Sequence, residues 1–292
     1  MRLKELEAPD FDLARTLDSG QVFHWEKCGD GYAGTIGTEG VYVEQQRNRL
    51  SFAGTTAEGI GNYFALDHPL AEIRRSFPTD PAMCAARDFC EGLRIIRQPH
   101  WECLATFITS SMKQVAHIRQ ISRALRVRYG ASQLVRGCEI HSFPEASRIA
   151  KLVEQDLRAC ALGYRARNLL ATARLVSSGH ADLQQWTTLS DELLRARLCE
   201  LPGVGAKVAN CVMLFAYERL RAFPIDVWIE RVLKQKYFPR KRKLTATQLR
   251  AFCETYFGEH GGYAQQYLFH HARKGGATHR TAAPGRPRSE RC

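Results

Sequence analysis

The chain has 292 residues, of which 45% are hydrophobic and 25% charged, a composition typical of a globular protein with a buried core. Its 42 lysines and arginines exceed the 30 aspartates and glutamates, and the formal net charge of +12 suits a polyanionic partner such as nucleic acid. The charged start does not resemble a signal peptide, and no apolar run approaches the roughly 18 residues of a membrane span, so we expect an intracellular protein with no membrane association.

The first part of the chain predicts a β-rich unit. Short runs of β-forming residues alternate with turn-forming segments, as in an antiparallel meander. The predicted strands are 21–25, 31–36, 41–44 and 49–52, separated by turns at 28–31, 37–40 and 46–48.

From about Thr56 onward the apolar residues recur three and four positions apart, which predicts helices. The predicted helices cover 82–96, 101–111, 115–128, 165–177, 191–200, 208–217 and 227–237. An N-terminal antiparallel β-sheet domain (residues 1–80) packed on a mainly helical body (81–274) is an α+β fold. The composition of residues 275–292 predicts a basic, disordered tail.

The ten cysteines are spread singly along the chain, without a C-x-x-C pair or a zinc-type spacing. Most of them fall inside apolar helical patterns. We therefore expect reduced thiols and no metal site.

The segment LPGVGAKVANC, residues 201–211, predicts a tight turn between two helices, a helix–hairpin–helix at about 191–217. Gly203 and Gly205 permit backbone conformations closed to other residues and let the chain approach a ligand closely. The amides of such a turn, at a helix N-terminus, form a phosphate site. The segment lacks the spacing of a nucleotide P-loop and the third glycine of a dinucleotide fold.

Lys207, at the start of the second hairpin helix, has two interpretations. It is either a phosphate contact or an amine nucleophile, because the helix dipole and apolar neighbours disfavour its ammonium form. Asp226, in the segment FPIDV, is placed to cap the helix that begins at Val227. The chain between them can fold back to bring Asp226 near Lys207, and an amine beside a carboxylate suits displacement at a sugar carbon.

The hairpin LPGVGAKVA, followed 19 residues after its lysine by the aspartate of FPIDV, resembles the helix–hairpin–helix DNA glycosylases. In having the lysine, the hairpin resembles that of their bifunctional members. Two branches of that superfamily carry an iron–sulfur cluster on four C-terminal cysteines, whereas only Cys253 and Cys292 follow Cys211 here. The resemblance therefore implies a bifunctional enzyme without an iron–sulfur cluster.

Further segments resemble the eukaryotic-type 8-oxoguanine DNA glycosylase/lyase from about Leu17 to about Ala272. Besides the hairpin and its aspartate, the matching segments are LDSGQVFHW (17–25), NYFALDHPLAEI (62–73), RQPHWECLATFITSS (97–111), LGYRAR (162–167) and AQQYLF (264–269). The resemblance implies a monomeric base-excision repair enzyme whose partner is double-stranded DNA containing oxidised guanine. It implies no cofactor, although hairpin carbonyls near Leu201 and Val204 could hold a monovalent cation.

The resemblance also implies roles for four residues of a base pocket. Gly20 falls where the family uses a backbone carbonyl to accept the N7–H of 8-oxoguanine, a hydrogen that guanine lacks. Cys211 and Phe269 match the residues that sandwich the flipped base, and Gln265 matches the amide that reads its Watson–Crick edge. By residue type alone, Gly20 also fits a turn, and Cys211 and Phe269 also fit the hydrophobic core.

On the side of the intact duplex the chain departs from the family pattern. Tyr164 matches an aromatic wedge, and Arg165 matches an arginine that reads the unpaired cytosine. Met112, however, stands in place of an asparagine that bonds this cytosine, and His117 in place of a second arginine. We therefore expect a relaxed preference for the base opposite the lesion. Trp228 replaces a family histidine near the DNA backbone, which puts that phosphate contact in doubt.

The implied mechanism makes Lys207 the nucleophile at C1′ of the sugar, with Asp226 stabilising the developing positive charge. The resulting Schiff base permits β-elimination and strand cleavage. Two alternatives stay open: a glycosylase/lyase for another oxidised or ring-opened base, and a non-catalytic module that only binds the DNA backbone. The basic segment 239–243 and the basic tail indicate nonspecific, salt-sensitive affinity for DNA.

Overall fold

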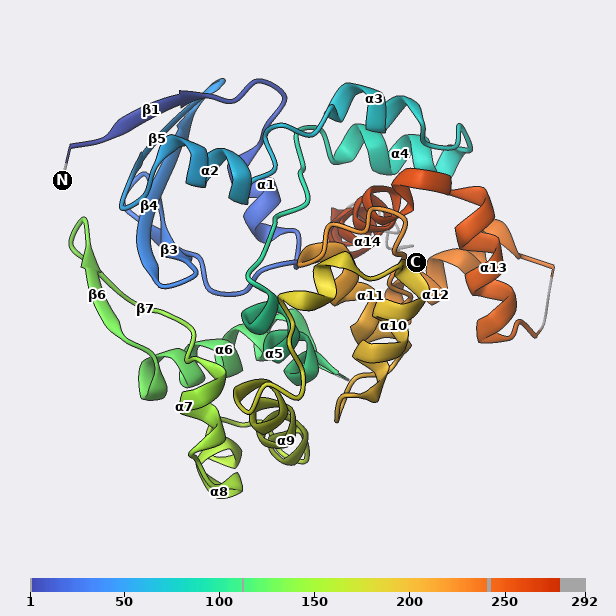
Figure 1. Cartoon of the computed structure of the whole chain (residues 1–292). Coiled ribbons are helices and arrows are strands. Elements are labelled where there is room, and N and C mark those ends of the chain that lie inside the picture. The colour runs from blue at the N-terminus through green and yellow to red at the C-terminus, as the bar shows by residue number, and fades with distance from the viewer. Residues whose placement is uncertain (1, 112, 241–242, 279–292) are drawn as a thin grey trace, which may run out of the picture.

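The computed structural model describes residues 2–111, 113–240 and 243–278. Its architecture confirms the predicted α+β class: an N-terminal antiparallel sheet lies beside a mainly helical body (Figure 1). Within residues 2–111 the sheet has five strands in the order β1-β5-β4-β3-β2, every pair antiparallel. The strands are β1 (Lys4–Glu7), β2 (Glu26–Cys28), β3 (Gly31–Ile36), β4 (Glu39–Gln46) and β5 (Arg49–Ala53).

The two faces of this sheet are covered by different elements. Helices α1 (Leu13–Asp18) and α2 (Ala57–Tyr63) pack their apolar residues against Val43 and Phe52, which face each other across β4 and β5. The hairpin of β6 (Ser132–Val135) and β7 (Cys138–His141) covers part of the opposite face, with contacts to β3 and β4. Figure 1 shows this hairpin as a green ribbon extending from the helical body toward the sheet. The sheet is therefore the central layer of the N-terminal unit.

The remaining elements form the helical body. Its α-helices are α3 (Leu70–Arg75), α4 (Pro81–Phe89), α5 (His100–Ser110), α6 (Val115–Tyr129), α7 (Ala146–Ala150), α8 (Glu154–Arg158), α9 (Arg165–Ser177), α10 (Asp191–Glu200), α11 (Ala206–Phe215), α12 (Val227–Val232), α13 (Ala246–Tyr256) and α14 (Gly261–Thr278). Shorter helical turns of other types are η1 (Gln185–Thr188), η2 (Leu233–Tyr237) and η3 (Gly258–His260). Among the described helices, none is long and apolar enough to cross a membrane.

Helix α11 is the centre of the body, because all of its residues from Val208 to Phe215 are buried. It packs on α10 and α5, while α14 packs on α4 and α12. Helices α10 and α11 are joined only by residues 201–205, so they form the predicted helix–hairpin–helix. This packing brings α5, α11, α12 and α14 together.

The predicted strand at 21–25 is wrong, and so is the extension of the helix at 82–96 beyond Phe89. Both corrections have one cause. The buried side chain of Gln21 accepts a hydrogen bond from the amide of Ile96 and donates one to the carbonyl of Arg94. Gln98 in turn donates to the carbonyl of Gln21. Side-chain amides, rather than a strand ladder or a helix, satisfy the backbone of these two segments.

The prediction of reduced cysteines is wrong for one pair. Cys28, at the end of β2, forms a disulfide with Cys138, at the start of β7. Their pairing follows from the β6–β7 hairpin, which the sequence pattern did not predict and which brings residue 138 against the sheet. Among the described residues, the cysteines outside the disulfide are 84, 90, 103, 160, 199, 211 and 253.

At the C-terminal end, α14 runs to Thr278 and so extends past the predicted start of the tail. Most of that tail, residues 279–292, lies outside the described residues.

Candidate active site

A pocket of about 960 Å³ lies where α5, α11, α12 and α14 converge with the segment around Gly20. Most of the residues predicted to act on a damaged nucleotide line it. These are Gly20, Gly205, Lys207, Cys211, Asp226, Gln265 and Phe269. The fold therefore gathers into one cavity residues that are spread over most of the sequence.

The hairpin before α11 determines where the helix that carries Lys207 begins. Gly203 has a φ of +84°, and a Cβ at this position would lie 2.8 Å from the side chain of Asn168, so glycine is required. Gly205 is the N-cap of α11, and the space where its Cβ would stand is open. A ligand can therefore approach the backbone there closely, which agrees with the predicted grip on a DNA backbone.

Lys207 lies in the first turn of α11 and is half-buried. Its Nζ donates a hydrogen bond to Oγ of Ser110, 3.2 Å away, and lies 5.2 Å from the centre of the Phe107 ring. These contacts come from α5 and leave the amine at the wall of the pocket.

Asp226 caps α12, as predicted, because its Oδ1 accepts a hydrogen bond of 2.8 Å from the amide of Ile229. Burial raises the pKa of Asp226, while the amide of Ile229 and the charge of Lys207 act in the opposite direction. The carboxylate and the amine of Lys207 line the same pocket. The two residues whose approach was predicted therefore lie on one cavity.

The walls of the base pocket match the sequence expectations in position. Cys211 is buried one turn after Lys207, and burial raises the pKa of its thiol to about 11, so it is a neutral, polarisable wall at neutral pH. Phe269, from α14, lies against Gly20, which has a φ of +87°. Gln265 is 4% exposed, and within the described part of the chain its Oε1 has no hydrogen-bond partner. A buried acceptor of this kind is suited to a ligand that donates.

The residues predicted to contact the intact duplex are more dispersed. Tyr164 is 59% exposed at the start of α9, and His117 is exposed in the first turns of α6. Arg165 is buried, and its guanidinium donates to the carbonyl of Ser111 and stacks on the Tyr164 ring at 4.4 Å. Met112 lies outside the described residues.

Trp228, in the first turn of α12, is 43% exposed and lines the pocket near its rim. Arg231 lies 5.4 Å from the centre of its ring. An exposed aromatic ring with a cation beside it can stack on a base or lie along a sugar.

Phe107, Ser110 and Arg273 are among the pocket residues that were not predicted. Arg273 follows Phe269 by four positions and Gln265 by eight, so helical spacing places all three on one face of α14. That spacing was visible in the sequence. The roles of Phe107 and Ser110 depend on the packing of α5 against α11, which no local pattern reveals.

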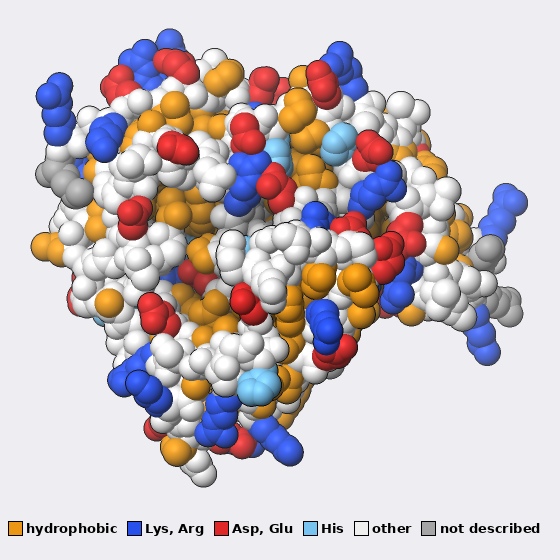
Figure 2. All heavy atoms as spheres, in the orientation of Figure 1, with side chains coloured by type: hydrophobic (Ala, Val, Ile, Leu, Met, Phe, Trp, Pro, Cys, Tyr) orange, Lys and Arg blue, Asp and Glu red, His pale blue; other side chains and the backbone are white. Residues whose placement is uncertain are grey.

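On the face seen in Figure 2, basic and acidic side chains of described residues are interspersed. Among the described residues, no group of three or more His, Cys, Asp or Glu side chains could hold a metal ion. In the hairpin, the carbonyl of Leu201 accepts the amide hydrogen of Val204 at 3.1 Å.

Comparison with known proteins places this site in a family. Residues 4–104 match the family model of the N-terminal domain of 8-oxoguanine DNA glycosylase, and residues 105–256 match that of the HhH-GPD superfamily base excision DNA repair proteins.

The N-glycosylase/DNA lyase OGG1 of Arabidopsis thaliana is 29% identical over 91% of this chain and 78% of its own length. The N-glycosylase/DNA lyase of Saccharomyces cerevisiae is 28% identical, over 88% of this chain and 82% of its own. A solved structure of the Clostridium acetobutylicum 8-oxoguanine glycosylase/lyase, in complex with double-stranded DNA containing cytosine opposite 8-oxoguanine, is 28% identical. It superposes with a TM-score of 0.86, over 94% of this chain and 100% of that one. With the HhH-GPD model alone matching more than half of its residues, the chain belongs to the HhH-GPD superfamily of base excision DNA repair proteins.

Proposed function

We propose that this protein is a DNA glycosylase that excises 8-oxoguanine from duplex DNA and then cleaves the abasic strand through a Schiff base on Lys207. One observation carries the proposal: Lys207 and Asp226 line the same pocket as Gly20, Cys211, Gln265 and Phe269. Relatives that align over most of the chain are N-glycosylase/DNA lyases, which supports it.

The first step is exposure of the lesion, since a base inside the stack cannot reach a pocket enclosed by helices. The hairpin amides around Gly205 hold the phosphate backbone, and the exposed ring of Tyr164 props open the vacated position. The flipped base then lies between Cys211 and Phe269. The carbonyl of Gly20 accepts its N7–H, a hydrogen that guanine lacks.

Base excision is a displacement at C1′ of the sugar. The lone pair of Lys207 Nζ forms a bond to C1′ as the bond from C1′ to N9 breaks, and that electron pair leaves with the base, which takes up a proton. Positive charge develops on the sugar as the bond breaks. Asp226, fixed by its bond from Ile229, stabilises that charge without having to reorient.

Strand cleavage follows from the covalent intermediate. The Lys207 amine loses a proton and the sugar ring opens, which gives a protonated Schiff base at C1′. The Schiff base acidifies the 2′ hydrogen, so its removal expels the 3′ phosphate by β-elimination. These steps need no metal ion, and a monovalent cation on the Leu201 and Val204 carbonyls would serve only the hairpin's grip.

Partners and location follow from this activity. The partner is double-stranded DNA with an oxidised guanine, and the protein works as a monomer inside the cell, where that DNA is.

A panel of lesion duplexes tests the proposal. Single-turnover excision is measured on matched duplexes carrying 8-oxoguanine, a ring-opened purine, an oxidised pyrimidine or undamaged guanine. We expect the fastest excision on the 8-oxoguanine duplex. Faster excision of a ring-opened purine or oxidised pyrimidine would assign the pocket to that lesion instead. Binding without excision of any base would make the protein a non-catalytic DNA-binding module.

A further inference from the structure

Arg273 places a guanidinium in the base pocket. It lies on α14 one turn after Phe269, with its Cζ 5.6 Å from the centre of that ring, and it lines the pocket. It also packs directly against Gly20, because a Cβ at that glycine would lie 3.1 Å from Nη1 of Arg273. The cation therefore stands next to the backbone segment that is expected to read the lesion.

This guanidinium is incompletely satisfied by the protein. It donates to the backbone carbonyl of Asp18, and within the described residues its Nε is buried without a partner. Burial lowers the pKa of Arg273, as expected for a cation drawn from water.

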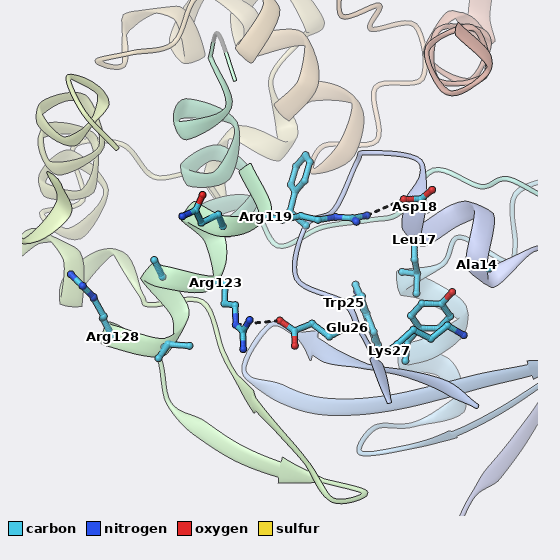
Figure 3. A pocket seen from close by; sticks show the side chains of 14 residues that line it. Ala14, Leu17, Asp18, Trp25, Glu26, Lys27, Arg119, Arg123 and Arg128 are labelled. Carbon is cyan, nitrogen blue, oxygen red and sulfur yellow. Dashed lines mark hydrogen bonds and ion pairs between the residues drawn. The ribbon is translucent and has the colours of Figure 1, made fainter. Parts of the chain in front are cut away.

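The carboxylate of Asp18 is already engaged by two other cations. Lys274 lies 2.7 Å from Oδ2 of Asp18, and Arg119 lies 3.1 Å from Oδ1. Figure 3 shows Arg119 reaching from α6 to Asp18 across a second cleft. Among the described residues Arg273 thus has no ion pair, and its side chain lines the pocket, with Nη1 on the side of Gly20.

The chemistry of the lesion matches this arrangement. 8-Oxoguanine differs from guanine at two adjacent ring positions: N7 carries a hydrogen, and C8 carries a carbonyl oxygen. A reader of both differences needs an acceptor and a donor side by side. Gly20 supplies a backbone carbonyl, and Arg273 supplies the donor beside it.

We propose that Arg273 is a specificity-determining residue that donates a hydrogen bond to the C8 carbonyl oxygen of the flipped base. The inference rests on the proposed function and adds a second reading of the same lesion. Guanine has a hydrogen at C8 and cannot accept this bond, so guanine would leave a buried cation unpaired.

Two substitutions test the proposal. Arg273→Met keeps the apolar stem and removes every donor, and Arg273→Lys keeps the charge and a donor. Each variant is assayed on two duplexes: one with 8-oxoguanine, for single-turnover base excision, and one with a preformed abasic site, for strand cleavage. The abasic duplex contains no base, so its cleavage does not depend on base reading.

We expect Arg273→Met to slow excision of 8-oxoguanine about 10- to 100-fold, the range for losing a hydrogen bond to a charged group. Arg273→Met should still cleave the abasic duplex at the wild-type rate. The rate at which Arg273→Lys excises 8-oxoguanine should fall between those of the wild type and Arg273→Met. The matched control is Lys274→Met, which removes the same charge from the next residue, outside the pocket, and leaves both rates unchanged.

Two results would overturn the inference alone: wild-type excision by Arg273→Met, or an equal loss on both duplexes, which would indicate a structural role. A wild-type protein that cleaves the abasic duplex but excises no 8-oxoguanine would instead overturn the proposed function, and this inference with it.

Discussion

Lys207 donates a hydrogen bond from Nζ to Oγ of Ser110 over 3.2 Å, which ties the first turn of α11 to the last residue of α5. The hairpin fixes where α11 begins, and α5 fixes where the amine of its first turn points. Phe107, one turn earlier on α5, supplies a ring face for the same amine. The proposed nucleophile is thus positioned by two helices before any DNA binds, and such preorganisation lowers the barrier to reaction.

The variant Asp226→Asn separates the proposed catalytic role of Asp226 from its role as a helix cap. An asparagine oxygen still accepts the amide of Ile229, so the start of α12 is kept. The raised pKa of Asp226 means that its charge costs folding free energy at neutral pH, so removal of the charge leaves the melting temperature equal or higher. We expect excision to slow about 100- to 1000-fold, the usual loss for one preorganised electrostatic stabiliser. Single-turnover kinetics and thermal unfolding check both parts, and a near-wild-type rate would contradict the assignment.

The opposite-base preference is expected to be relaxed. An apolar Met112 and an exposed His117 replace the two usual partners of the unpaired cytosine, while the guanidinium of Arg165 already bonds the carbonyl of Ser111. Excision of 8-oxoguanine opposite each of the four bases should therefore proceed at comparable rates. The double variant Met112→Asn and His117→Arg should gain preference for cytosine. Strict cytosine dependence of the wild type would refute this expectation.

The disulfide between Cys28 and Cys138 closes a long loop, with a sequence separation of 110 residues. Reduction of this bond raises the conformational entropy of the unfolded chain. We therefore expect reductant to lower the free energy of unfolding by about 2–4 kcal/mol. Thermal unfolding with and without reductant measures this. The double variant Cys28→Ser and Cys138→Ser should show no response to reductant, and Cys199→Ser, at an exposed free cysteine, should respond like the wild type. Identical melting temperatures of the wild type in both buffers would show that the bond does not form.

Acid should weaken the contact between the N-terminal unit and the helical body. A hydrogen bond with His68, and then those with Arg97, lower the pKa of Glu218 to about 2 from an ordinary 4.5. The folded state therefore binds the proton of this carboxyl more weakly than the unfolded state. The resulting stability is present above about pH 4.5 and is lost as the pH falls toward 2.

In Glu218→Gln this part of the pH dependence should disappear, so its melting temperature falls less steeply over that range than the wild type's. The difference should be modest, because the side chain of Glu218 is 40% exposed and solvent screens it. Glu259→Gln, at an exposed pair with Arg221, is the control. Parallel curves for wild type and Glu218→Gln would contradict the assignment.

Much of this fold follows from local patterns in the sequence. The bounds of α9 and α10 agree with the periodicity of their apolar residues, and Asp226 caps α12 where its position after Pro224 indicated. The pairing of Lys207 with Asp226 in one pocket was predicted because a hairpin, one helix and a short loop connect them. Short-range geometry therefore accounts for the centre of the site.

Contacts between distant segments were not predictable in this way. Residues 21–25 and 90–96 have apolar patterns suited to a strand and a helix, yet the side chains of Gln21 and Gln98 connect the chain around these two segments. The disulfide depends on a hairpin inserted far from β2 in the sequence. Helical spacing puts Arg273 on the same face of α14 as Gln265 and Phe269, but its contact with Gly20 depends on how that helix packs.

The central claim, that Lys207 forms a covalent bond to the sugar, is tested most directly by borohydride trapping on an 8-oxoguanine duplex. Borohydride reduces a Schiff base to a stable amine, so protein and DNA migrate together on a denaturing gel. We predict such an adduct for the wild type and none for Lys207→Gln, with binding to the same duplex retained. An adduct that persists in Lys207→Gln, or a wild type that excises the base without ever being trapped, would contradict the account.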